Sequence, residues 1–270
     1  MGKFNVGLIA AVALCACSGV RAGSDEAEKK MFVVVPVADV RAKRTTHSKE
    51  YVQDQDQETQ VIQGEPVLVK ETSGEWARVE CPQQPEFTHH DKWEGYPGWV
   101  ELSALSSDPS REEPVVASTM TDSDLRRAFI DEASRHMGEP YLWGGRSYHD
   151  ASYRRTVTGV DCSGLVNLSF RKLGIIVPRD AHEQFMKARR IEPNELRPGD
   201  LIFAAPKERA DRVVHVAIYA GNGEIVEAPQ SGQPVHRISI RDRFGMEATE
   251  MSNGMAIGDR VIYFGTLFES

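Results

Sequence analysis

Residues 161–164 read Asp161-Cys162-Ser163-Gly164 and decide the fold, because they join a glycine-rich loop to an apolar segment with helical spacing. The apolar residues of that segment recur at the positions expected for the buried face of a helix: Leu165, Val166, Leu168, Phe170 and Leu173. Gly174 and Pro178 then indicate the end of the helix. Cys162 is therefore predicted at a helix N-terminus, where free N–H groups and the positive dipole end favour the thiolate, the reactive form of cysteine.

A histidine about fifty residues downstream is the predicted base. In the strand expected over residues 213–219, alternation places His215 away from the aliphatic face. Gly221-Asn222-Gly223 predicts a hairpin turn, and residues 224–228 form the returning strand. A loop with an odd number of residues would place Glu227 on the face of His215, whereas a two-residue loop would place it on the opposite face.

On the favourable register, Glu227 accepts an imidazole N–H of His215 and fixes the orientation of the ring. Cys162, His215 and Glu227 are then the nucleophile, the base and the orienting residue of a predicted catalytic triad. His236, on the next predicted strand, is the alternative to Glu227 as the orienting residue.

Four motifs, in this order, make the C-terminal part resemble the NlpC-type (NlpC/P60) cell-wall cysteine peptidases. They are Pro140-Tyr141-Leu142-Trp143-Gly144-Gly145, Asp161-Cys162-Ser163-Gly164-Leu165, Leu196-Arg197-Pro198-Gly199-Asp200-Leu201 and His215-Val216-Ala217-Ile218-Tyr219-Ala220-Gly221-Asn222-Gly223. The resemblance implies an α+β papain-like cysteine peptidase domain over residues 120–268. The third catalytic position is most often histidine in this family, so Glu227 departs from the pattern. A long insertion at 146–160 is expected to cap or reshape the cleft.

A second, smaller domain is predicted upstream. Residues 31–105 contain short β-branched runs separated by polar, glycine-containing turns, a pattern typical of a small all-β barrel. The stretch Gly95-Tyr96-Pro97-Gly98-Trp99-Val100 and its neighbours resemble a bacterial SH3-like domain, a common companion of this peptidase class. Residues 106–119 are interpreted as a linker, and a helix is expected from near Thr121 to Gly138.

The resemblance also implies residues that bind substrate. In similar two-domain enzymes, the SH3-like domain closes one end of the cleft and requires a free N-terminal L-alanine. Glu65 and Tyr96 match the positions expected to contact that amine, and Asp161 would add a negative charge; a turn carboxylate and a barrel aromatic are the alternative interpretations of Glu65 and Tyr96. Tyr141, Trp143 and Ser163 complete the predicted substrate contacts, with packing as the alternative for Trp143 and helix capping as a compatible role for Ser163.

The function implied is that of a cysteine endopeptidase acting on peptidoglycan stem peptides, at the bond between γ-D-glutamate and a diamino acid such as meso-diaminopimelate. Two alternatives stay open: an amidase or acyltransferase on the same fold, and a non-catalytic wall-binding protein. The implied mechanism needs no cofactor. No set of cysteines, histidines and carboxylates shows metal-ligand spacing; the nearest, His89-His90-Asp91, is interpreted as a solvated loop.

Composition and targeting signals set the expected compartment. A formal net charge of −8 and a pI near 5.6 argue against a nucleic-acid-binding protein. Residues 1–22 resemble a cleaved signal peptide whose apolar run is too short to span a bilayer, so we expect export to the periplasm or cell envelope and no transmembrane segment in the mature chain. A lipoprotein acylated at Cys17 is the alternative. Cys81 is expected to be a free core residue rather than a disulfide partner of Cys162. The sequence makes no prediction of oligomeric state.

Overall fold

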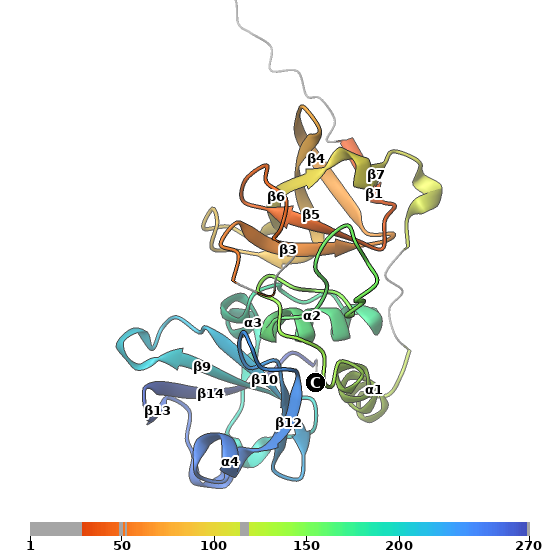
Figure 1. Cartoon of the computed structure of the whole chain (residues 1–270). Helices are drawn as coiled ribbons and strands as arrows, with labels where there is room; N and C mark the ends of the chain where they lie inside the picture. Colours follow the sequence, from red (N-terminus) through yellow and green to blue (C-terminus); the bar gives the residue numbers. More distant parts are fainter. Residues whose placement is uncertain (1–28, 49–50, 52, 114–118, 269–270) are drawn as a thin grey trace, which may run out of the picture.

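The computed structural model describes residues 29–48, 51, 53–113 and 119–268 (Figure 1). The predicted signal peptide over 1–22, including Cys17, lies outside the described residues. Within the described ranges, no helix combines the length and the apolar character that crossing a membrane would require.

The N-terminal part forms one antiparallel sheet of seven strands in the order β3-β2-β6-β5-β4-β1-β7. Its strands are β1 (Lys29–Val33), β2 (Val37–Arg41), β3 (Gln57–Ile62), β4 (Pro66–Ser73), β5 (Trp76–Glu86), β6 (Glu94–Glu101) and β7 (Leu105–Ser106). Side-chain alternation builds the core of this sheet, since Ala77, Val79 and Cys81 are buried along β5. Cys81 is a free thiol in that core, as expected from the sequence.

The C-terminal part combines a second antiparallel sheet, in the order β12-β11-β10-β9-β14-β13, with helices. The helices are α1 (Asp122–Ser134), α2 (Cys162–Lys172), α3 (Ala181–Lys187) and α4 (Ile240–Phe244). The strands are β8 (Arg189–Arg190), β9 (Leu201–Pro206), β10 (His215–Gly221), β11 (Glu224–Glu227), β12 (His236–Ser239), β13 (Met255–Ile257) and β14 (Arg260–Thr266). This arrangement confirms the α+β class predicted for the region.

Both predicted helices are present, and their ends follow the expected signals. Helix α2 begins at Cys162, and Gly174 follows its C-terminus with a φ of 81°, a left-handed conformation that suits glycine. Helix α1 begins after Thr121, whose side chain accepts the N–H of Asp124. It ends at Ser134, four residues before the predicted end at Gly138, because turns occupy the intervening residues.

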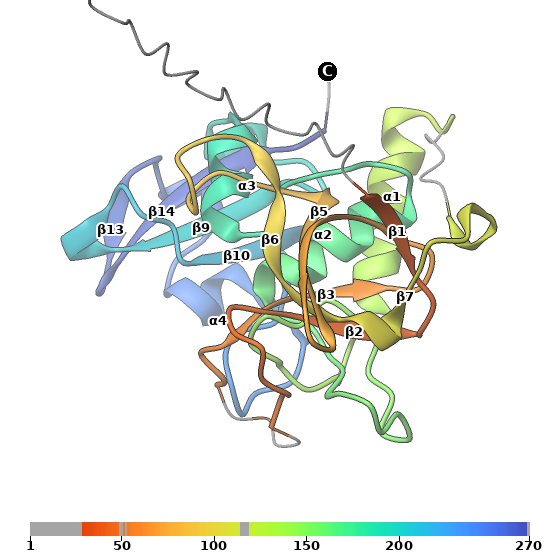
Figure 2. The same ribbon diagram turned by 90° about the horizontal axis from the view of Figure 1, so that it is seen from above.

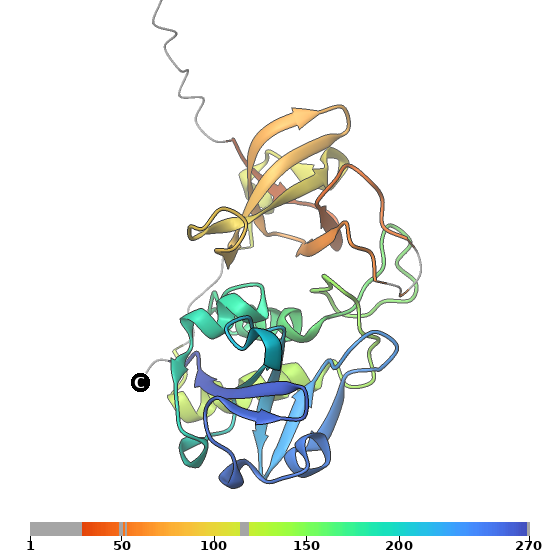
Figure 3. The same ribbon diagram turned by 90° about the vertical axis from the view of Figure 1, so that its left-hand side faces the viewer.

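Helices α2 and α3 lie between the two sheets, as Figures 1 and 3 show from two directions. In the view from above, the N-terminal sheet covers α2 (Figure 2). Ten of the eleven residues of α2 are buried, which is expected for a helix with one sheet on either side.

Buried charges join the N-terminal sheet to the C-terminal part. The carboxylate of Glu65 accepts hydrogen bonds from Nη1 and Nη2 of Arg146 at 3.0 and 2.8 Å and lies 2.6 Å from Nε of Arg171. Arg179 donates from Nε to Oγ1 of Thr59 at 2.7 Å. Arg146 and Arg179 are fully buried, so these contacts satisfy groups that have no access to water.

The insertion at 146–160 does not cap the cleft, contrary to the expectation from its length. It packs against the N-terminal sheet instead: the Tyr153 hydroxyl donates to the carbonyl of Val37 at 2.8 Å, and the Gln60 side-chain amide donates to the carbonyl of Val157 at 2.7 Å. No residue of the insertion is among those that line the cleft around Cys162. Its backbone and buried Arg146 therefore extend the contact between the two parts.

Candidate active site

Cys162 occupies the first turn of α2, and Asp161 caps that helix. The Asp161 carboxylate accepts the N–H of Gly164 at 2.6 Å and the N–H of Gly144 at 2.9 Å. It also receives two hydrogen bonds from Arg179, at 3.0 and 2.9 Å. The carboxylate thus ties the helix N-terminus to the Gly144 turn and its charge is paired with a buried guanidinium. The carboxylate predicted to add a negative charge near the substrate amine is thus held in an ion pair with Arg179.

The first turn of α2 packs closely against the turn that contains Gly145. A Cβ atom built on Gly164 would lie 2.1 Å from the carbonyl oxygen of Gly145, far inside contact distance. Only glycine allows this approach, and the approach fixes where the thiol of Cys162 lies.

His215 starts β10 and faces Glu227 across the neighbouring strand. The pairs Ile218–Val226 and Tyr219–Ile225 match even positions with even and odd with odd, which puts Glu227 on the face of His215 as predicted. The turn itself has only two residues, Asn222 and Gly223, both with positive φ. A bulge before Gly221 adds the extra residue that restores the favourable register.

Glu227 contacts both candidate histidines but orients one of them directly. Oε2 of Glu227 lies 2.6 Å from Nε2 of His215, whereas Oε1 lies 3.3 Å from Nε2 of His236 and accepts a hydrogen bond from Nε of Arg243 at 2.7 Å. Burial by itself would raise the pKa of Glu227, but the hydrogen bond from His215 and the charges of His215 and Arg243 lower it to about 2. Glu227 is therefore an anion throughout the physiological range.

Cys162 is near enough to His215 to raise the pKa of the ring, and Glu227 contacts its Nε2. Because Nε2 faces Glu227, the Nδ1 edge is left for Cys162. Burial alone would lower the pKa of His215, but the hydrogen bonds and charges of Cys162 and Glu227 outweigh it and raise the pKa to about 9. This arrangement favours an imidazolium as the neighbour of Cys162.

Cys162 opens into a cleft of about 520 Å³ formed by both parts of the chain. The N-terminal sheet and the loop after β5 contribute Gln57, Glu58, Thr88, His89 and Tyr96. The C-terminal part contributes Tyr141, Trp143, Gly144, Asp161, Cys162, Ser163, Asp180, Ala181, His182, Arg212, Val213 and Val214. Cys162 therefore shares one cavity with residues of the N-terminal sheet that lie more than sixty positions earlier in the sequence.

One side of this cleft is acidic. The Tyr96 hydroxyl lies 3.0 Å from Oδ2 of Asp180 and 3.2 Å from Oε2 of Glu58. Burial raises the pKa of Asp180 to about 6, and the charge of Glu183 adds to the rise although that of Arg179 opposes it. Burial likewise raises the pKa of Tyr96, so its hydroxyl stays protonated.

Residues 138–253 match the family model described as the NlpC/P60 family. This part of the chain belongs to the NlpC/P60 family. The family predicted from four sequence motifs is thereby confirmed.

Curated relatives of the chain are named as peptidoglycan enzymes. It is 34% identical to the bifunctional muramidase/DL-endopeptidase CwlT of Bacillus subtilis over 52% of this chain and 40% of the relative. It is 27% identical to the γ-D-glutamyl-L-lysine dipeptidyl-peptidase of the same organism, over 68% and 76% respectively. It is 36% identical to the peptidoglycan endopeptidase RipB of Mycobacterium tuberculosis, over 54% and 59%. The chain thus spans about half the length of the first and third of these relatives.

A solved NlpC/P60 family protein from Bacillus cereus shares the fold of most of the chain. It superposes with a TM-score of 0.61 at 20% identity, over 78% of this chain and 94% of that protein. This likeness supports the papain-like architecture predicted for the catalytic part.

The cleft around Cys162 does not include Glu65, which the sequence predicted as a contact with substrate. Only 1% of Glu65 is exposed, and its carboxylate is held by Arg146 and Arg171 away from the cleft lining. Glu58, seven positions earlier, is the carboxylate that lies beside Tyr96. Glu58 is the second residue of β3, and nothing in the local sequence pattern distinguishes it from a solvent-exposed strand residue.

The other predicted substrate contacts line the cleft. Tyr141 is nearly buried, and burial with the neighbouring Cys162 charge raises its pKa, so its hydroxyl is a proton donor. Trp143 is 43% exposed at the cleft edge. The hydroxyl of Ser163 accepts a hydrogen bond from Arg179 at 3.0 Å and lies 3.3 Å from Asp161, so it also supports the helix cap.

Two further cleft residues were not singled out as site residues from the sequence. Nδ1 of His182 is buried and has no hydrogen-bond partner among the described residues. Burial and the nearby charge of Arg212 lower the pKa of His182, which keeps the ring neutral. Arg212 lines the same cavity, and in the described part of the chain no carboxylate lies within ion-pairing distance of it. The cleft therefore carries a cation as well as its acidic side.

Proposed function

We propose that this protein is a cysteine endopeptidase that hydrolyses the bond between γ-D-glutamate and a diamino acid, such as meso-diaminopimelate, in peptidoglycan stem peptides. The observation that carries the proposal is that Cys162, the neighbour of the His215–Glu227 pair, opens into the same cleft as the acidic cluster of Glu58, Tyr96 and Asp180. The names of the relatives support a hydrolase acting on murein.

The proposed chemistry uses the charge state that the site favours. The thiolate of Cys162 attacks the γ-carbonyl carbon of D-glutamate, a C–S bond forms, and the carbonyl electrons move onto oxygen. The free backbone N–H groups at the start of α2, those of Cys162 and Ser163, are suited to hydrogen-bond that oxyanion. The imidazolium of His215 donates its proton to the leaving amine as the C–N bond breaks.

Hydrolysis of the acyl-enzyme completes the cycle. Water attacks the thioester carbonyl and passes one proton to His215, the C–S bond breaks to regenerate the thiolate, and the glutamyl carboxylic acid leaves and loses its second proton to solvent. Glu227 keeps the imidazole in place and stabilises the imidazolium through both steps. None of these steps requires a cofactor.

The acidic cluster is proposed to bind the free N-terminal amine of L-alanine. An ammonium group suits two carboxylates and a hydroxyl oxygen, and Glu58, Asp180 and Tyr96 provide them. In this assignment Glu58 takes the role that the sequence analysis gave to Glu65. An acetylated amine carries no charge and is larger, so such a peptide is excluded.

The remaining features of the proposal concern organisation and location. We propose that residues 31–105 are a bacterial SH3-like domain, 106–119 a linker and 120–268 the catalytic domain. The seven-stranded sheet with its own buried core supports the first of these boundaries. Relatives that act on peptidoglycan support export to the cell envelope by the 1–22 signal, with a lipid anchor at Cys17 as the alternative.

A tripeptide assay tests the function. The mature protein, Cys162→Ala and the control Cys81→Ala are incubated with L-Ala-γ-D-Glu-meso-diaminopimelate and with its N-acetylated form, and products are followed by mass spectrometry. We expect diaminopimelate release from the free peptide alone, by the wild type and Cys81→Ala only. Cleavage of both peptides would retain the peptidase and reject the amine pocket. Cleavage of neither would favour an amidase, an acyltransferase or a wall-binding protein.

A further inference from the structure

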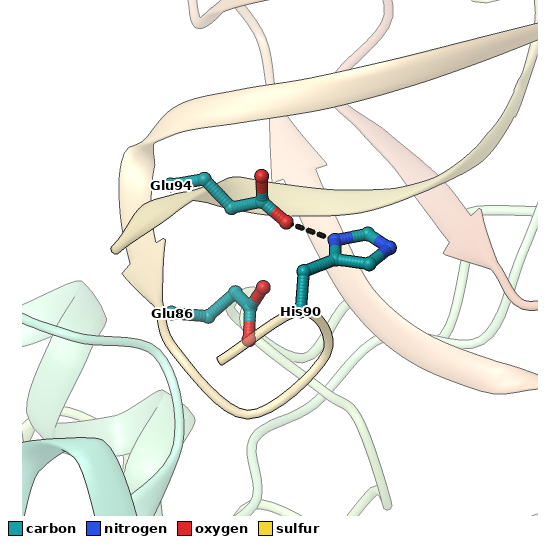
Figure 4. Close-up of side chains that lie close together, drawn as sticks. All are labelled: Glu86, His90 and Glu94. Atoms are coloured by element: carbon teal, nitrogen blue, oxygen red, sulfur yellow. Dashed lines mark hydrogen bonds and ion pairs between the residues drawn. The ribbon is translucent and has the colours of Figure 1, made fainter. Parts of the chain in front are cut away.

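A cluster of two carboxylates and one imidazole lies at the hairpin between β5 and β6, apart from the Cys162 cleft. Glu86 and Glu94 are direct partners across the two strands, and His90 returns toward them from the connecting loop (Figure 4). One ligand atom from each of the three side chains lies within 4.8 Å of the others. Like charges placed directly opposite each other destabilise a hairpin unless something neutralises them.

Glu86 gives independent evidence that this cluster binds a ligand. The residue is 0% exposed, and its Oε1 has no hydrogen-bond partner in the described part of the chain. Its other oxygen, Oε2, accepts the backbone N–H of His89 at 3.0 Å and lies 3.0 Å from Nδ1 of that ring. In Figure 4 one carboxylate oxygen of Glu86 points toward the space shared with His90 and Glu94. A buried carboxylate oxygen without a partner is costly and therefore rare.

Glu94 contacts one basic side chain through each carboxylate oxygen. Oε1 contacts Nδ1 of His90, and Oε2 lies 2.7 Å from Nζ of Lys92. Lys92 is a long side chain and 65% exposed, so it can move into solvent when a stronger cation arrives. The unpartnered oxygen of Glu86 is not among its contacts.

We propose that Glu86, His90 and Glu94 bind a divalent transition-metal cation, with Zn²⁺ as the best match. Zinc accepts imidazole nitrogen and carboxylate oxygen together, whereas calcium and magnesium take oxygen ligands. Two carboxylates balance the two charges of the ion, and the bound ion satisfies Oε1 of Glu86. The ligands are spaced four residues apart on two strands and a loop, which is why the sequence pattern showed no known metal motif.

The proposed metal site lies at the base of a loop whose residues line the cleft. Thr88 and His89, in the same loop, line the cavity, and Oγ1 of Thr88 donates to Oε1 of Glu183 at 2.7 Å. Nδ1 of His89 lies 3.0 Å from Oε2 of Glu86, and Nε2 of the same ring lies 3.6 Å from Oε2 of Glu58. A cation between the strands fixes the base of this loop and is therefore structural, because its ligands do not line the cleft.

Zinc binding is tested in the full mature chain carrying Cys162→Ala, so that the thiol and His215 cannot bind the ion together. Titration calorimetry with zinc chloride, and elemental analysis after dialysis, measure affinity and stoichiometry. We expect one zinc per chain and a rise in melting temperature with zinc. His90→Ala and Glu94→Gln, each added to this background, should weaken binding at least tenfold and remove the rise.

Two loop variants serve as controls. Asp91→Asn changes an exposed neighbour whose φ of 53° asparagine tolerates, and it should leave the affinity within twofold. Lys92→Ala removes the competing ammonium and should tighten binding. Absence of stoichiometric zinc, or equal affinity in Cys162→Ala and in its His90→Ala derivative, would overturn the site. His90 is exposed, so its loss leaves the fold intact and the comparison valid. None of these outcomes depends on peptidase activity.

Discussion

The carboxylate of Glu227 lies 2.6 Å from Nε2 of His215, and its second oxygen lies 3.3 Å from Nε2 of His236. Glu227 is buried, and Arg243 holds the other carboxylate oxygen. A carboxylate here orients the ring as a histidine would and, in addition, stabilises the imidazolium by its charge.

Replacing Glu227 by glutamine should reduce kcat by about two orders of magnitude or more, because the amide neither stabilises the imidazolium nor fixes the tautomer. Glu227→His should recover part of the rate. His236→Gln is the matched control, since His236 contacts only the far oxygen of Glu227, and it should keep kcat within about threefold. Equal losses in Glu227→Gln and His236→Gln would assign the orienting role to the histidine. Steady-state kinetics on the free tripeptide measure all three.

The pH profile of kcat/KM should fall on the alkaline side with a midpoint near 9. The proton on His215 is needed by the leaving amine, and the pKa of His215 is raised to about 9 by Cys162 and Glu227 against the opposing effect of burial. His215 is therefore fully protonated well below pH 9 and loses its proton as the pH rises past 9. Glu227→Gln should move this limb to lower pH. A limb that stays at the same pH in that variant would contradict the assignment.

The acidic side of the cleft predicts that KM depends on pH in the acidic range. Burial raises the pKa of Asp180 to about 6, so its negative charge is present above this pH and is lost as the pH falls through it. KM for the free-amine peptide should therefore rise below pH 6. Asp180→Asn should have a high KM that no longer changes in this range, and Glu58→Gln should also raise KM several-fold. Asp211→Asn, an exposed residue outside the cleft lining, is the control and should behave as wild type.

Glu65 should matter for stability rather than for substrate binding. Glu65→Gln leaves two buried arginines, Arg146 and Arg171, without their carboxylate, and breaking a buried pair costs about 3–5 kcal/mol. Glu101→Gln removes an exposed partner of Arg155 and should cost about 1 kcal/mol or less. Chemical denaturation measures both. A selective rise in KM for the free-amine peptide in Glu65→Gln, at unchanged stability, would return Glu65 to the amine pocket.

Gly164→Ala should disable the enzyme without removing any functional group. The new Cβ would lie 2.1 Å from the Gly145 carbonyl oxygen, so the start of α2 must move away and carry the Cys162 thiol with it. A displacement of this kind can cost about a hundredfold in rate. Gly74→Ala, which meets no atom within 4 Å but has a φ of 60°, controls for generic strain and should retain activity. Full activity in Gly164→Ala would show that the contact is dispensable.

Local patterns in the sequence predicted the elements that carry Cys162, His215 and Glu227. They succeeded because helix spacing, capping and strand alternation are set by nearby residues. The hairpin shows the limit: its turn has two residues, which by itself predicts the wrong face for Glu227, and a bulge before Gly221 corrects the register. Bulges depend on packing across the whole sheet and leave only a weak local signal.

The acidic cluster shows a second limit. Glu58 and Glu65 lie in one short segment, and only the packing of the N-terminal sheet on α2 decides which faces the cleft. Glu65 pairs with Arg146 and Arg171 and is therefore buried. Glu58 lies beside Tyr96 and Asp180 and therefore faces the cavity. Such choices between similar side chains are made by long-range contacts.

The chain of contacts from Thr59 through Arg179 to Asp161 has a practical consequence for protein engineering. Arg179 is fully buried and joins the N-terminal sheet to the cap of the helix that carries Cys162. A fragment cut before residue 120 would remove Thr59 from Arg179 and Glu65 from Arg146 and Arg171, and it would expose these buried side chains to water. We therefore expect that the catalytic half is not a transplantable module: chimeras that exchange the first sheet need a matching set of threonine, glutamate and glutamine residues on the incoming partner.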